Sequence, residues 1–175
     1  MSTIMYHPVE QIDDLSLRER EDAMGAYLMM FAALAAGLPL PIINLIAAII
    51  YYFLNRAKSR FVKFHSLQSL LSQIPTTLLN AGLVFWTFRI IFKNGSFNDS
   101  DIFIEGFASV SEAYWGYLWV VVGANLLYVI FSIIGAIKAR QGRYYYFLFF
   151  GKLAYHQAYK IENEGGQSTI NEPPK

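Results

Sequence analysis

The sequence predicts an all-α fold: a bundle of four transmembrane helices over residues 18–153, with both chain ends in the cytoplasm. Only 15% of the 175 residues are charged, against about 25% in an ordinary soluble domain. The charges are also segregated, because residues 23–55, 64–88 and 113–137 contain no Asp, Glu, Lys or Arg. A charge at the centre of a bilayer costs about 2.5–3.5 kcal/mol, whereas an apolar core helix of a soluble protein usually runs about 10–14 residues. The long runs therefore favour membrane spans over a soluble helical bundle.

The first uncharged run predicts two short helices. Pro39 and Pro41 each remove a backbone donor and clash with the preceding turn, which argues against a straight helix through them. We expect a tight hairpin with spans at 22–38 and 40–55 and with its turn near the far interface. Each half is about 23 Å long at 1.5 Å per residue, which is short for a span, so one kinked span over 23–55 is the alternative.

The other two runs predict full spans at 66–92 and 114–138, joined by an extracytoplasmic loop at 94–113. A helix of 25 residues extends about 37 Å, and a hydrocarbon core is about 30 Å thick. Pro75 lies inside the first of these spans and is expected to interrupt it, which would free the carbonyl of Leu71.

The short loops predict the orientation. The loop after the first run carries four bases and no acid: Arg56, Lys58, Arg60 and Lys63. The loop after Lys93 carries four acids and no base: Asp99, Asp101, Glu105 and Glu112. Bases follow the last run at Lys138, Arg140, Arg143 and Lys152. Basic loops remain in the cytoplasm. The hairpin is therefore expected to begin and end on the cytoplasmic side, and the last span is expected to end there.

The remaining segments are predicted to lie outside the hydrocarbon. Residues 1–17 are polar and acidic and lack the apolar core of a signal peptide, and their acids argue against a transit peptide. This favours a bacterial cytoplasmic (inner) membrane. Ser16 and Glu19 have the spacing of a capping box, which predicts a helix start. Residues 143–159 are aromatic and should anchor in the cytoplasmic interface, and 162–175 should form a disordered tail.

Polar side chains gather on one face of the span at 66–92. Their spacing of three and four residues puts His65, Ser69, Ser72, Thr76 and Asn80 on this face, with Gln68 and Gln73 at its margins. Such a face either bonds to neighbouring helices or lines a hydrated path. We favour helix–helix bonding, and a path through the membrane is the alternative.

The residues that support chemistry are scarce. The chain has no Cys, which excludes disulfides, cysteine-ligated zinc and thiol catalysis. The three histidines, His7, His65 and His156, form no metal-spaced set, and the acids lie almost wholly in loops and tails. We therefore expect no enzyme, no cofactor and no metal site. The net charge of +1 argues against a nucleic-acid partner.

Two short segments resemble a known membrane family. Residues 60–71 read RFVKFHSLQSLL, and residues 137–144 read IKARQGRY. They resemble the small four-helix family that includes the twenty-kilodalton inner-envelope subunit of the chloroplast protein-import translocon and its uncharacterised bacterial relatives. The matching positions are Val62, Lys63, Phe64, His65 and Gln68, then Lys138, Ala139, Gly142 and Tyr144, while Ser69 stands where Ala is usual. The resemblance implies a four-helix fold and, for the plastid branch, membership of a protein-conducting complex.

The predicted function is that of a non-enzymatic integral membrane protein. It would be a subunit or accessory of a membrane complex, in protein translocation or envelope biogenesis, with the lipid bilayer and other membrane subunits or further copies of itself as partners. The alternative is a small channel or carrier lined by the polar face of the third helix. A third interpretation is a lipid-interacting scaffold that uses the aromatic and basic C-terminal segment.

Overall fold

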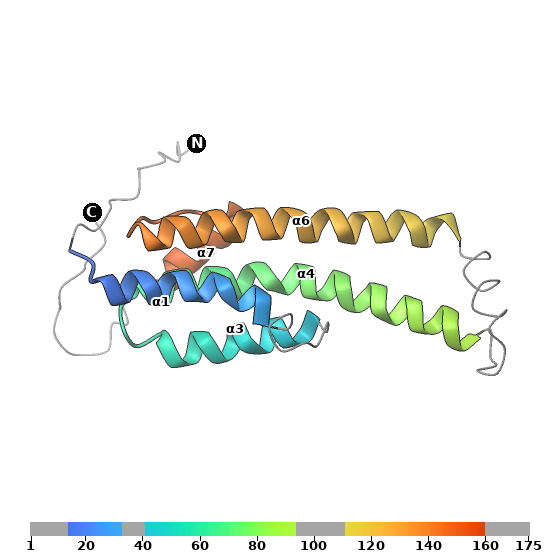
Figure 1. Ribbon diagram of the computed structural model, residues 1–175, viewed down its shortest axis with the longest axis horizontal. Helices are drawn as coiled ribbons and strands as arrows, with labels where there is room; N and C mark the ends of the chain where they lie inside the picture. Colours follow the sequence, from blue (N-terminus) through green and yellow to red (C-terminus); the bar gives the residue numbers. More distant parts are fainter. Residues whose placement is uncertain (1–13, 33–40, 94–110, 160–175) are drawn as a thin grey trace, which may run out of the picture.

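A computed structural model describes residues 14–32, 41–93 and 111–159, and every regular element within these ranges is helical. The elements are α1 (Leu17–Leu28), the short 3₁₀ helix η1 (Met29–Phe31), α3 (Pro41–Asn55), α4 (Arg60–Lys93), α6 (Glu112–Arg140) and α7 (Leu148–Ala158). Figure 1 shows them as one elongated bundle. The all-α prediction is confirmed for the described part of the chain.

Helix α1 begins where the capping box was predicted. The Ser16 hydroxyl accepts a hydrogen bond from the Glu19 amide at 3.3 Å, and the Glu19 carboxylate accepts one from the Ser16 amide at 3.0 Å. Burial tends to raise the pKa of Glu19, but the bonds from Ser16 outweigh it and hold the pKa below its usual value. The Glu19 carboxylate therefore stays ionised and bonded to Ser16 at neutral pH, and these bonds fix the start of α1.

Ion pairs gather the charged helix ends at one end of the bundle. Asp22 of α1 accepts from Lys58, in the α3–α4 turn, at 2.8 Å. Glu21 pairs with Arg140, at the end of α6, at 2.5 Å. These contacts place the beginning of α1, the α3–α4 turn and the end of α6 at a common level.

Two described helices are long and apolar enough to cross a membrane. They are Arg60–Phe92 and Glu112–Arg140, whose most apolar 18-residue stretches have mean hydropathies of 1.3 and 2.4. The 34 residues of α4 extend about 51 Å. The expectation that Pro75 interrupts this span is wrong, because α4 runs through Pro75 as a single helix.

The first two predicted spans are shorter than the other two. Helix α3 agrees with the predicted segment 40–55, but Ile42–Asn55 is only a short apolar helix, and α1 ends at Leu28. The described structure thus supports two spans, and it does not confirm four. Pro39 and the hairpin turn, the loop at 94–110, the tail and residues 1–13 lie outside the described residues.

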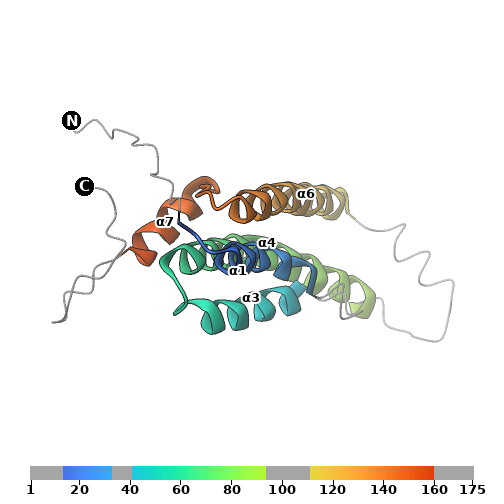
Figure 2. The ribbon, with the colours of Figure 1, turned by 60° about the vertical axis from the view of Figure 1, so that its left-hand side comes forward.

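The core lies at the charged end of the bundle. Helices α1, α3 and α7 each pack against the first half of α4, and α1 also packs against the second half of α6 (Figure 1); Figure 2 shows the same grouping from another side. The main cluster joins α1, α4, α6 and α7 through Tyr27, Phe61, Phe64, Ala139 and Ala154.

A glycine ends α6 and turns the chain toward α7. Gly142 has φ +74°, which favours glycine because it has no Cβ. The amide of Gly142 donates to Ala139 at 2.9 Å and that of Arg143 to Lys138 at 2.9 Å. These bonds satisfy the last carbonyls of the helix and set the direction of the aromatic segment.

Candidate functional site

The polar face of α4 is a set of buried contacts at the charged end of the bundle. His65 is fully buried, and its Nδ1 lies 2.9 Å from the hydroxyl of Tyr27 on α1. Gln68 Nε2 donates to the same hydroxyl at 2.7 Å. Two polar groups of α4 thus hold one tyrosine of α1, and Tyr27 is only 2% exposed.

Gln68 and Ser69 extend these contacts to two other segments. Gln68 Oε1 accepts the amide of Phe147, just before α7, at 3.2 Å. Ser69 Oγ donates to the Ala26 carbonyl of α1 at 2.8 Å. Gln68 therefore joins α1, α4 and the segment that leads into α7.

Ser72 and Thr76 bond within α4. The Ser72 hydroxyl donates to the Ser69 carbonyl at 2.8 Å, and that of Thr76 donates to the Gln73 carbonyl at 3.0 Å. These bonds satisfy the hydroxyls inside their own helix.

Asn80 forms a reciprocal pair with Asn125 of α6. Each side-chain amide donates to the other oxygen, at 3.0 and 3.1 Å, and each also donates to a carbonyl one turn earlier in its own helix. Further along the two helices, Tyr117 donates to the Leu79 carbonyl at 2.9 Å, and the Thr87 and Tyr114 hydroxyls lie 2.8 Å apart. The second half of α4 is thus bonded to the first half of α6.

A double-mutant cycle on Asn80 and Asn125 is expected to give a coupling of about 0.6 kcal/mol, and at most about 1.7 kcal/mol, because the pair lies in a membrane bundle. The single variants Asn80→Leu and Asn125→Leu would each leave one amide without its partner, and the double variant would leave none. The measurement is the free energy of unfolding in detergent for the four proteins. Strict additivity would mean that the pair contributes nothing to holding α4 on α6.

Gln73 and Tyr128 are buried polar residues whose side chains make no hydrogen bond within the described part of the chain. Gln73 is 2% exposed, and neither its oxygen nor its nitrogen is bonded. The hydroxyl of Tyr128 on α6, a residue 7% exposed, is also unpaired. Buried polar groups usually have hydrogen-bond partners. Gln73 and Tyr128 therefore mark a place in the interior where the hydrogen-bonding capacity of polar side chains is not fully used.

The two family-motif segments meet in the core. Tyr144 lies over His65 with nearly parallel rings, 6.0 Å apart, and contacts Phe64 edge-on at 5.1 Å. Val62, Gln68 and Ala139 are buried there as well, and Lys63 and Lys138 are half-buried. The fold thus brings together residues that are about 75 positions apart in the sequence.

The aromatic segment after α6 packs some of its side chains on the bundle and exposes other, apolar ones. Tyr144 and Phe147 are buried, whereas Leu148 and Phe149 are exposed. Burial, together with the nearby Tyr155 and Tyr159, raises the pKa of Tyr146 to about 12. The tyrosines of this cluster are therefore neutral at physiological pH, as packing against an apolar core requires.

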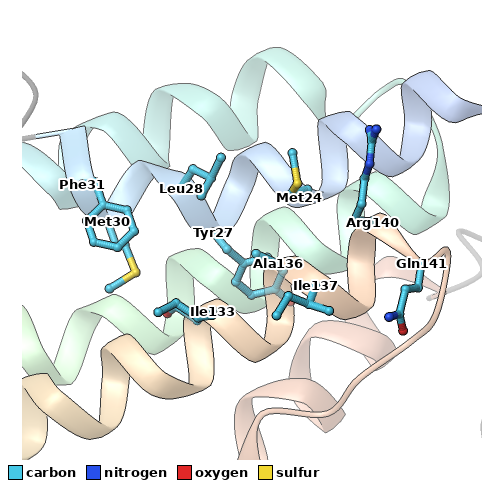
Figure 3. Close-up of a pocket in the computed structure, with 11 residues that line it drawn as sticks. Met24, Tyr27, Leu28, Met30, Phe31, Ile133, Ala136, Ile137, Arg140 and Gln141 are labelled. Carbon is cyan, nitrogen blue, oxygen red and sulfur yellow. The ribbon is translucent and has the colours of Figure 1, made fainter.

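A groove of about 280 Å³ lies between α1 and α6. Figure 3 shows Met24, Tyr27 and Met30 on one wall, Ile133 and Ile137 on the other, and Arg140 and Gln141 at one end. The lining is almost entirely apolar, and the described residues contain no group of three His, Asp or Glu side chains that could hold a metal ion. The groove suits an apolar chain better than a polar substrate.

Tyr27 and Gly151 gave no signal in the sequence, whereas Gly135 belongs with Ser132 and Ala139 to a set of small residues at helical spacing, which predicts close packing of helices. Tyr27 was one aromatic residue in a long apolar run, yet it is the centre of the buried contacts. A Cβ on Gly135 would lie 2.7 Å from the Tyr27 ring, and one on Gly151 would lie 2.6 Å from both Gln68 Oε1 and the Tyr146 Cα. The spacing of small residues indicates a close approach at Gly135, but the partner in such an approach depends on which helices meet, and no local pattern encodes it.

Comparison with known proteins corrects the family resemblance. Residues 20–153, more than half of the chain, match the model of the MamF/MmsF family, described as the magnetosome magnetite crystal formation protein family. The proposed resemblance to the chloroplast translocon family is therefore wrong, and the expectation of protein translocation loses its support. No protein with a curated function and no solved structure matches the chain.

Proposed function

Because the chain belongs to the magnetosome magnetite crystal formation family, we propose that it is an integral protein of the magnetosome membrane that takes part in forming the magnetite crystal. The observation that carries this proposal is the family match over residues 20–153. The membrane expected from the sequence alone was the bacterial cytoplasmic membrane. The family favours the magnetosome membrane instead.

We assign α4 and α6 as the two full spans, with both chain ends in the cytoplasm. The basic residues of the α3–α4 turn and of the α6 end support this orientation. All three tryptophans, Trp86, Trp115 and Trp119, lie toward the other end of the α4–α6 pair, where aromatic side chains favour the membrane interface. From His65 to Trp86, α4 rises about 32 Å, close to the thickness of a hydrocarbon core.

In this topology, the connection between α4 and α6 lies on the side away from the cytoplasm. Its sequence carries Asp99, Asp101 and Glu105, and no base follows Lys93 before α6 begins. Carboxylates are hard oxygen ligands that suit cations of first-row metals. The role that fits is non-enzymatic: the membrane helices position an acidic segment toward the growing crystal.

The triple variant Asp99→Asn, Asp101→Asn and Glu105→Gln is expected to change crystal size or number in a magnetite-forming bacterium that lacks its own copy of the chain. The matched control neutralises three acids near the start of the chain, Glu10, Asp13 and Asp14, which would face the cytoplasm. Electron microscopy of the crystals is the measurement, with the unmodified chain as the complementing standard. Crystals that remain normal in cells without the chain would overturn the proposed function. Equal defects in both variants would show that the acidic segment has no special role in crystal formation.

A small channel or carrier is the second candidate. The observation in its favour is that Gln73 and Tyr128 are neighbours in the interior, although their polar atoms form no well-aligned hydrogen bond in the described part of the chain. Most of the polar face is already engaged in bonds to helices, which favours packing over a path. Ion flux into proteoliposomes that is lost in Gln73→Leu, with stability retained, would support this candidate, and a flux that is absent from the unmodified chain would dismiss it.

A further inference from the structure

The bundle has two unequal halves. We call the end that contains α1, α3 and α7 the wide half, and the part of α4 after Gln73 with the part of α6 before Tyr128 the narrow half. Every buried residue of α4 lies between Phe61 and Gln73, and none lies between Ile74 and Phe92. In Figure 1, α4 and α6 run on as a pair beyond the ends of α1 and α3.

The narrow half has the surface of a membrane segment. Its exposed side chains include Leu78, Phe85, Phe88, Trp119, Val120 and Leu126. An exposed apolar surface of this extent is typical of contact with lipid. The narrow half therefore lies in the hydrocarbon and is not an arm in water.

The described helices α1 and α3 do not follow α4 to the far interface. Along α1, the Ala26 carbonyl is bonded to Ser69, and Met30 packs with Tyr128. From Gln73 to Trp86, α4 continues for about 20 Å, and two helices that followed it would need about thirteen residues each. Only residues 32–40 separate η1 from α3, which is too few.

Helix α7 adds to the wide half. It packs against the first half of α4 and exposes Leu148, Phe149 and Leu153, with Lys152 beside them. A helix with exposed apolar side chains and a base inserts at the level of the headgroups. It occupies area in the same leaflet as the hairpin.

We propose that the chain is a wedge that senses and stabilises membrane curvature. This proposal rests on the topology proposed above, which puts the wide half in the cytoplasmic leaflet. A helix with its side chains is about 10–12 Å wide and so covers about 80–110 Å² of a leaflet. The cytoplasmic leaflet holds α1 and α3 in addition to α4 and α6, and α7 at its surface, whereas the other leaflet holds two helices. The partner is a lipid bilayer whose cytoplasmic leaflet is convex. The convex leaflet of a curved bilayer has more area than the concave leaflet, and the wide half fills part of that area.

The first test uses the two orientations of the protein as controls for each other. The full chain is reconstituted into vesicles of mixed diameter, and protein density per membrane area is measured against diameter for each orientation. Molecules with the cytoplasmic face outward should be severalfold denser in the smallest vesicles, and molecules with that face inward should be depleted there. The same size preference in both orientations, or none in either, would overturn the wedge.

The second test measures depth and separates the two proposals. The chain has no Cys, so single substitutions Ala57→Cys, Ser111→Cys and Ile42→Cys can each be labelled alone. The topology predicts labelling of position 57 from the cytoplasmic side and of position 111 from the opposite side. The wedge predicts that a probe at position 42 is quenched most by a quencher at the bilayer centre and reacts from neither side. Reversed labelling at 57 and 111 would overturn the topology, whereas correct labelling there with reaction of position 42 from the far side would overturn the wedge alone.

Discussion

Gly135→Ala is expected to lower the free energy of unfolding by about 1–3 kcal/mol, the usual cost of overpacking a well-packed core. The added Cβ would stand 2.7 Å from Cε1 and 2.9 Å from Cζ of the Tyr27 ring. Tyr27 cannot swing aside without loss, because its hydroxyl is held by His65 at 2.9 Å and by Gln68 at 2.7 Å. The strain must therefore separate α1 from α6.

Gly123→Ala is the matched control for this prediction. Gly123 lies on the same helix, and a Cβ there would meet nothing within 4 Å. Alanine is a better helix former than glycine by about 0.8–1.0 kcal/mol, so Gly123→Ala should be neutral or stabilising. Denaturant titration in detergent, followed by circular dichroism, compares the two variants. Equal stability of the two would show that α1 does not pack on α6 at Gly135.

Gln68→Leu is expected to destabilise the bundle and to loosen α7. The substitution removes the acceptor of the Phe147 amide and a donor to Tyr27. A buried group left without its partner costs about 1–3 kcal/mol. Two groups are affected here, and the Phe147 amide loses the bond that holds the start of α7 on α4.

Gln73→Leu is the matched control: it makes the same chemical change at a neighbouring buried site, but it is not expected to lower the stability of the bundle. Neither polar atom of Gln73 has a partner, so replacing this side chain by an apolar one removes an unsatisfied group and should be neutral or stabilising. Unfolding free energy and protease sensitivity of the C-terminal segment are the measurements. If Gln73→Leu proves as damaging as Gln68→Leu, Gln73 must make a contact that stabilises the fold, and the neighbouring Tyr128 on α6 is the side chain in reach.

The wrong family resemblance has a physical explanation. Its motif positions combine basic and aromatic residues at the cytoplasmic ends of helices, for example Lys63 with Phe64 and Lys138 with Tyr144. Any helix that crosses the cytoplasmic interface favours this combination. Short motifs of this kind report the membrane interface more reliably than they report ancestry, and the match over residues 20–153 replaces them.

The polar face was predictable as a face, but its contacts were not. Helical periodicity places His65 and Asn80 on one side of α4, since residues three and four apart share a face. It does not say that His65 meets Tyr27 and that Asn80 meets Asn125. Periodicity describes one helix, and a contact needs the relative placement of two.

By itself, the sequence determined that the chain is helical, that its long helices lie near 66–92 and 114–138, and where the charged ends fall. These features follow from local physics, because the cost of a charge in hydrocarbon acts on every residue independently of the fold. Only the tertiary structure decided where along α4 the described helices α1 and α3 lie, that α7 packs against α4, and which residues Gly135 and Gln68 meet. Depth and contact depend on packing between segments distant in the chain, and the unequal halves of the bundle are a consequence of that packing.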